Sequence, residues 1–189
     1  MISALLQYTR DEVFTRSLRV ACSTEVIVAA AVGITLGIYG PAWNLAHIKP
    51  TDVSTALLTY AAIAFGFCIS GMALVLTLPN QTFVTWLIRE PIRRKSTNAY
   101  SDLLFVFSWT AVCHWFLVLL AFLLLSLGSD HTDLLKWSDT RSWRTFVGIL
   151  FGLTIYSAIQ FLLTVITLSQ VGRLYINRIE REAEQARED

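Results

Sequence analysis

Residues 145–172 read TFVGILFGLTIYSAIQFLLTVITLSQVG and contain no charged side chain. A helix needs roughly 20 apolar residues to cross the hydrocarbon core of a bilayer, and this stretch exceeds that length. Other uncharged stretches of sufficient length lie at 26–48, 53–88 and 103–129. From these stretches we place the four spans at 20–40, 53–78, 103–127 and 146–171. The sequence therefore predicts an all-α integral membrane protein, a bundle of four transmembrane helices.

The composition supports this class. Hydrophobic residues make up 54% of the 189 residues and charged residues 15%, and the mean hydropathy of +0.55 is well above that of a water-soluble domain. The formal net charge is +1, so the charge balance does not indicate a protein that binds nucleic acid. Because the uncharged stretches occupy more than half of the chain, no segment remains for a separate catalytic domain of ordinary size.

The distribution of Lys and Arg predicts the orientation. Eleven flank the spans on one side: Arg10, Arg16, Arg19, Arg89, Arg93, Arg94, Lys95, Arg173, Arg178, Arg181 and Arg187. Four lie on the other side: Lys49, Lys136, Arg141 and Arg144. By the positive-inside rule, both termini face the cytoplasm of a plasma or inner membrane. We interpret the first span as an anchor, because the apolar core of a cleavable signal peptide, the alternative, has only about 7 to 15 residues.

The segments outside the spans divide in the same way. The predicted cytoplasmic parts are an amphipathic segment at 1–19, a basic loop at 79–102 and a charged helical tail at 173–189, and the outer loops are 41–52 and 128–145. In the tail, Ile176, Ile179, Ala183 and Ala186 follow a 3,4,3 spacing. Two heptads with Ala in half of the seam predict only a weak coiled coil.

Small residues recur every fourth position in three of the spans. Such repeats let helices approach closely in lipid, where burying Leu against Leu gains little. The predicted packing residues are Ala29, Gly33 and Gly37 in the first span, Ala62, Gly66 and Ser70 in the second, and Gly148 and Gly152 in the fourth. These seams fit either a compact monomer or an assembly in which at least one seam faces a neighbouring subunit.

Four polar residues inside the spans are candidates for a functional role: Glu25, His114, Gln160 and Thr164. Polar groups in lipid are costly and must be paired, so Glu25 is expected to reach water or pair with Arg19 or Arg173. We expect His114 to hydrogen-bond to Gln160, which lies at a similar depth. In the alternative interpretation these residues line a pore or exchange protons.

The sequence indicates no metal site, cofactor or catalytic motif. Cys22, Cys68 and Cys113 lie in different spans without CxxC spacing, and the only other histidines, His47 and His131, fall in outer loops, which argues against haem. An outer-loop group of Asp130, His131 and Asp133 is a weak candidate for contacting a cation. An intramembrane enzyme that uses His114 with Glu25 is unfavoured, because their depths differ by about 9 Å.

The basic inner loop contains aromatic and cationic side chains suited to the membrane surface. Residues 81–101 read QTFVTWLIREPIRRKSTNAYS. The candidate contact residues for lipid or a partner are Trp86, Arg89, Arg93, Arg94 and Lys95. This composition predicts an interfacial helix at anionic lipid headgroups, and a docking patch for a cytosolic protein is the alternative.

These observations lead to two functional hypotheses. The first is a non-enzymatic membrane protein, homo-oligomeric, that forms or gates a pore or channel, with the polar intramembrane residues lining it. The second is an anchoring or accessory subunit that recruits a cytosolic partner through its basic loop and tail.

Overall fold

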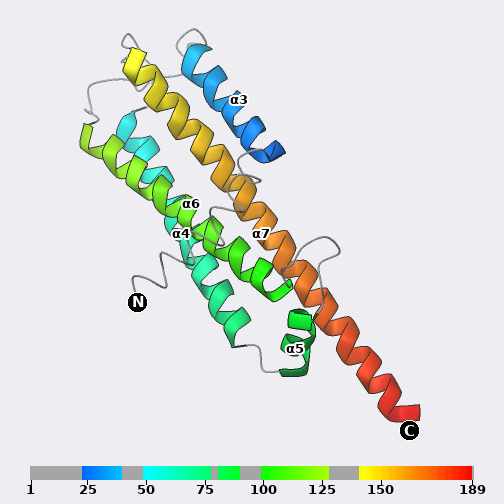
Figure 1. Ribbon diagram of the computed structural model, residues 1–189. Coiled ribbons are helices and arrows are strands. Elements are labelled where there is room, and N and C mark those ends of the chain that lie inside the picture. Colours follow the sequence, from blue (N-terminus) through cyan, green and yellow to red (C-terminus); the bar gives the residue numbers. More distant parts are fainter. Residues whose placement is uncertain (1–22, 40–48, 78–80, 90–98, 128–140, 189) are drawn as a thin grey trace, which may run out of the picture. The chain divides into compact units, whose positions relative to one another are not determined.

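The computed structural model describes residues 23–39, 49–77, 81–89, 99–127 and 141–188 (Figure 1). These residues are almost entirely helical and include no strand, which confirms the all-α class. The helices are α3 (Thr24–Tyr39), α4 (Pro50–Leu76), α5 (Gln81–Arg89), α6 (Ala99–Leu127) and α7 (Arg141–Glu188). The predicted amphipathic segment at 1–19 and most of both outer loops lie outside the described residues.

In the part of the chain that the structure describes, three helices are long and apolar enough to cross a membrane: Pro50–Leu76, Ala99–Ser126 and Arg144–Gln185. Helix α3 is apolar but has 16 residues, about 24 Å of helix against a hydrocarbon core of about 30 Å. The structure is thus compatible with a membrane protein, and it gives three helices of spanning length where the sequence predicts four. Of the first predicted span, at 20–40, residues 20–22 and 40 lie outside the described part.

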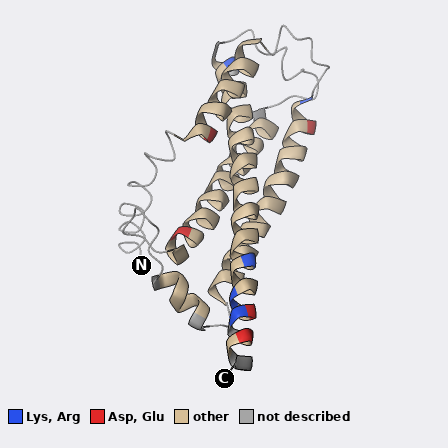
Figure 2. Cartoon of the chain, turned by 90° about the vertical axis from the view of Figure 1, so that its right-hand side faces the viewer, with Lys and Arg blue, Asp and Glu red and all other residues tan. Residues whose placement is uncertain are grey.

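The ends of the helices follow from local chemistry. Helix α4 begins at Pro50, whose missing N–H costs nothing in a first turn, and the Asp52 carboxylate in that turn favours the positive end of the helix dipole. Asp102 does the same in the first turn of α6. In Figure 2 the charged residues of the described part lie near helix ends or along the last part of α7, and the intervening stretches are uncharged.

The chain divides into two compact units. The first comprises residues 1–53 and 124–156, and the second comprises 54–123 and 157–189.

In the first unit, α3 packs against the beginning of α7 through the predicted glycine seams (Figure 1). A Cβ on Gly33 would lie 2.5 Å from the Gly148 carbonyl oxygen and 2.9 Å from the Gly152 Cα. A Cβ on Gly37 would lie 2.9 Å from the Arg144 carbonyl oxygen. The two backbones are therefore in direct contact, and the seams of the first and fourth predicted spans fill each other within one chain.

In the second unit, a different face of α4 packs inward from the one the sequence suggests. Ala62, Gly66 and Ser70 are exposed, and nothing lies within 4 Å of a Cβ built on Gly66. From residue 61 to residue 75 the buried residues of α4 are instead Ala61, Ala64, Cys68, Gly71 and Val75, at 3,4,3,4 spacing, and Ser54 is buried earlier in the helix. Cys68 and Val75 form a core with Leu103, Phe107 and Ala111 of α6, and Gly71 makes room for the Phe107 ring.

The close approach of α3 to α7 predicts the effect of Gly33→Ala. Backbone atoms cannot move aside for the added methyl group, so we expect a loss of about 1 to 3 kcal/mol in the free energy of unfolding, despite the better helix propensity of Ala. Unfolding of the detergent-solubilised protein measures it. The matched control is Gly172→Ala in α7, where nothing lies within 4 Å of a Cβ; equal losses in both variants would contradict the packing.

Candidate functional site

A polar cluster lies between three helices of the second unit. Its members are Tyr60 of α4, Thr110 and His114 of α6, and Ser157 and Thr164 of α7. Thr110 and His114 are four residues apart and so share one face of α6, and Ser157 and Thr164 are seven apart and share one face of α7. All except the half-buried Tyr60 are inaccessible to solvent.

Hydrogen bonds give the His114 ring a defined tautomer. Nδ1 lies 2.7 Å from the Thr110 carbonyl oxygen, and Nε2 lies 3.1 Å from the Tyr60 hydroxyl. A carbonyl can only accept, so Nδ1 carries the proton and donates it. In the neutral ring Nε2 is then an acceptor, so the Tyr60 hydroxyl donates to it.

The cluster continues on both sides of this pair. The Ser157 hydroxyl hydrogen-bonds to the Tyr60 hydroxyl, and it must be the donor because the Tyr60 proton is already directed at His114. Elsewhere, Thr164 Oγ1 donates to the Gln160 carbonyl oxygen at 2.8 Å. The Thr110 hydroxyl therefore donates to Thr164 Oγ1, 2.7 Å away. Every donor direction in the cluster follows from these partners.

Aromatic rings enclose the His114 side chain. The Tyr60 ring is tilted against it at a centroid distance of 5.4 Å, and the Phe161 ring meets it edge to face at 6.0 Å. Phe161 in turn packs edge to face on Phe67 at 5.2 Å. Such rings exclude water and strengthen the enclosed hydrogen bonds. The cluster thus links α4, α6 and α7 of this unit by polar contacts in apolar surroundings.

The predicted intramembrane residues are only partly brought together. His114 and Thr164 belong to the cluster and are joined through Thr110, but the expected hydrogen bond between His114 and Gln160 is wrong. Both ring nitrogens of His114 have other partners, and Gln160 contributes its backbone carbonyl instead of its side chain. Glu25 lies in the first turn of α3, half-buried, in the other unit.

The arrangement suits a structural link better than chemistry at an open site. The ring nitrogens of His114 are both occupied, and its side chain is fully buried. Cys68 and Cys113 are buried free thiols. Among the described residues, no group of three or more His, Cys, Asp or Glu side chains could hold a metal ion. Cys22 and the outer-loop group of Asp130, His131 and Asp133 lie outside that part of the chain.

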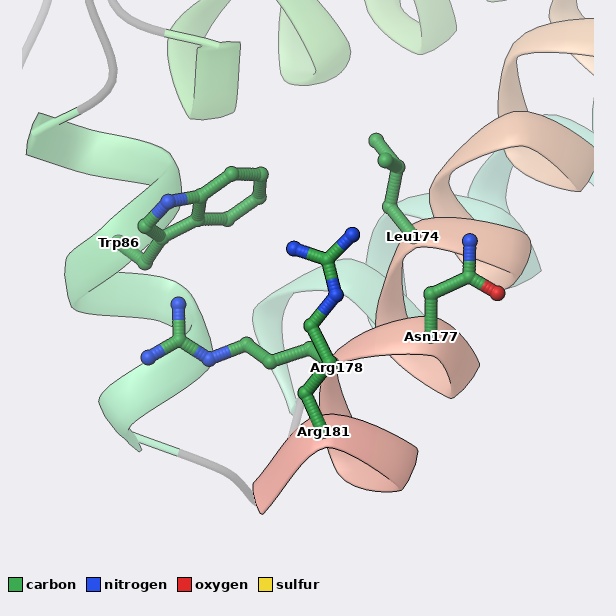
Figure 3. Close-up of a pocket in the computed structure, with 5 residues that line it drawn as sticks. All are labelled: Trp86, Leu174, Asn177, Arg178 and Arg181. Atoms are coloured by element: carbon green, nitrogen blue, oxygen red, sulfur yellow. The ribbon is translucent and has the colours of Figure 1, made fainter. Parts of the chain in front are cut away.

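A second candidate site is a basic pocket of about 160 Å³ in the same unit (Figure 3). It is lined by Trp86 of α5 and by Leu174, Asn177, Arg178 and Arg181 of α7. Trp86 is among the contact residues for lipid or a partner that the sequence predicts. The α7 residues that line the pocket are not among them. The other predicted contact residues cannot be placed, because the Arg89 side chain and all of Arg93, Arg94 and Lys95 lie outside the described residues.

Comparison with known proteins gives no functional assignment. No family model matches the chain, and neither a curated protein nor a solved structure matches it. The function has to be inferred from the residues themselves.

The hydrogen-bond directions predict the effect of Tyr60→Phe. The variant keeps the ring but removes the donor to His114 Nε2, leaving a buried acceptor unpaired. We expect a loss of about 1 to 2 kcal/mol in the free energy of unfolding in detergent. Tyr39→Phe is the matched control, because Tyr39 is 56% exposed in α3. If the two variants were equally stable, the proposed donor role of Tyr60 would be refuted.

Proposed function

We propose that the protein is a non-enzymatic membrane protein that works as a homo-oligomer, whose subunits meet along the exposed face of α4 and together form or gate a path through the membrane. The observation that supports this most is a stripe of small and hydroxyl-bearing residues exposed along α4. The stripe comprises Thr55, Thr59, Ala62, Gly66, Ser70 and Ala73, spaced 4,3,4,4,3. We call it the α4 stripe.

Large apolar side chains flank the α4 stripe on both sides. By helical geometry, Ile63 and Leu74 flank it on one side and Ile69 and Leu76 on the other. Their side chains are 67%, 56%, 47% and 63% exposed, respectively. A face that meets lipid tails has no need of small residues along its length, whereas a groove between apolar ridges accepts a neighbouring helix.

The polar groups of the α4 stripe are compatible with either a helix or lipid beside them. The Thr59 hydroxyl donates to the Thr55 carbonyl oxygen at 2.9 Å, so its proton is satisfied within the helix. Open space around Gly66 would let a second backbone approach closely, as the backbones of Gly33 and Gly148 do in the first unit. The driving force would be van der Waals packing at short distance.

In this proposal the α4 stripe lines the path, and the polar residues expected from the sequence do not. His114 and Thr164 are buried and fully engaged within one chain, so they do not face an opening. In an oligomer closed around α4, the hydroxyls of Thr55, Thr59 and Ser70 would lie at the contact between subunits, beside the axis. Hydroxyl oxygens and the carbonyls beside them can replace part of the hydration of a permeating ion.

The alternative function is an anchoring subunit for a cytosolic partner, and the end of α7 favours it. The helix continues to Glu188, well past the uncharged stretch that ends at residue 172. Arg173, Glu180, Arg181 and Glu184 are exposed on this extension. A charged helix projecting from a membrane is a suitable docking element, and this function requires no path through the membrane.

The variant Gly66→Leu tests the oligomer. It fills the groove, and we expect the subunits to dissociate about tenfold more readily, with the measured mass in detergent shifting towards the monomer. Ion flux through liposomes should fall in parallel. The control Gly172→Leu adds the same side chain at a glycine that also has open space around it, and it should leave both readouts unchanged.

Two outcomes would overturn the proposed contact along α4. The wild-type protein could be monomeric in detergent and in bilayers, or both glycine variants could lower the mass equally. An oligomer without ion flux would retain the α4 contact and favour the anchoring function over a path through the membrane.

A further inference from the structure

The basic pocket is built by contacts that fix α5 on α7. Phe83 and Leu87 form the buried face of α5, with exposed fractions of 0% and 3%. The Phe83 ring meets Tyr175 of α7 edge to face at a centroid distance of 5.0 Å and stacks on Trp86 at 5.8 Å. Trp86 is therefore held in place as one wall of the pocket, opposite the residues of α7 (Figure 3).

The opposite wall carries the charges. The Arg178 guanidinium carbon lies 5.7 Å from the centre of the Trp86 ring, at the distance of a cation–π contact. Arg181 follows one turn later, and Asn177 adds an amide that can donate. No acidic side chain is among the described residues that line the pocket, although Glu180 and Glu184 are exposed nearby on α7. The pocket thus offers planar N–H donors and positive charge, which suit a phosphate.

The position of the pocket along α7 matches the boundary of a bilayer. Arg173 is the first charged residue after the uncharged stretch, and the lining residues of α7 follow directly from Leu174 to Arg181. Leu174 is 47% exposed, and Leu163, three turns earlier on the same face, is 37% exposed. An exposed surface with a leucine at each end, and with Thr167 and Gln170 between them, thus leads from the predicted membrane interior to the charged groups.

We propose that this pocket binds the phosphate of an anionic phospholipid headgroup. Arg178 and Arg181 hold the phosphate oxygens, Asn177 donates to the headgroup, and Trp86 packs at the level of the lipid glycerol. The acyl chains lie against Leu174 and the exposed apolar face of α7 before it. A soluble phosphate compound would use the same donors but would gain nothing from that apolar surface.

The test compares lipid binding by the full-length protein and its variants. Native mass spectrometry of the detergent-solubilised protein, with added phosphatidylglycerol or phosphatidylcholine, counts the bound lipids. We expect the anionic lipid to bind more tightly, and Arg178→Gln together with Arg181→Gln to weaken its binding about tenfold or more. The matched control is Arg173→Gln, which removes an exposed charge on the same helix outside the pocket, and its affinity should stay near that of the wild type.

Further arms identify the source of the phosphate and separate binding from folding. Glycerol phosphate at millimolar concentration should not displace the lipid; displacement would assign the pocket to a soluble phosphate compound and overturn the proposal. Equal binding of both lipids, or equal losses in the control, would also overturn it.

Helix content and elution volume of each variant must match those of the wild type. The variant Arg178→Lys, which keeps the charge without the planar fork, should bind the lipid with intermediate affinity. Oligomeric mass is a separate readout, so this result does not depend on the α4 contact.

Discussion

An apolar interior offers no partner to a polar group, and this constraint accounts for the centre of the second unit. Five hydroxyl or imidazole groups on three helices are each paired with another, and the unprotonated nitrogen of His114 accepts a hydrogen bond from the Tyr60 hydroxyl. The hydrogen bonds between helices, from Thr110 to Thr164, Tyr60 to His114 and Ser157 to Tyr60, also fix how the helices are rotated. In a bilayer a rotated helix would leave several donors and acceptors unpaired at once, so the cluster specifies one arrangement of α4, α6 and α7.

The helices of the first unit are held together in a different way. It has glycines where the second unit has hydroxyls, and its helices meet through backbone atoms instead of side chains. Close contact of this kind gains dispersion energy over many atoms without requiring polar side chains. Such contact does not tolerate larger side chains. At Gly33 even a methyl group would overlap backbone atoms, whereas at Gly66 of the second unit the space is open.

The sequence predicted the helices and the glycine seams through which α3 and α7 pack, because both depend on neighbours within a few positions along the chain. It did not predict which face of α4 turns inward, since two small-residue repeats are interleaved there: Ala61, Ala64, Cys68 and Gly71 on one face, and Ala62, Gly66 and Ser70 on another. The choice between them depends on Phe107 of α6, which fits beside Gly71. The sequence also did not predict Tyr60 as the partner of His114, because the packing of α4 against α6 decides which residue of α4 faces His114.

The pairing of Trp86 with the end of α7 shows how a short helix between two long ones can acquire a specific role. As a topology determinant, α5 would need only basic residues near the membrane surface. Its buried Phe83, clamped by Tyr175, is unnecessary for that purpose and costs conformational freedom. The contact between Phe83 and Tyr175 holds the Trp86 ring at a fixed distance from Arg178. An arginine held over an aromatic ring at the boundary of an apolar helix is preorganised, so less entropy is lost when an anion binds there.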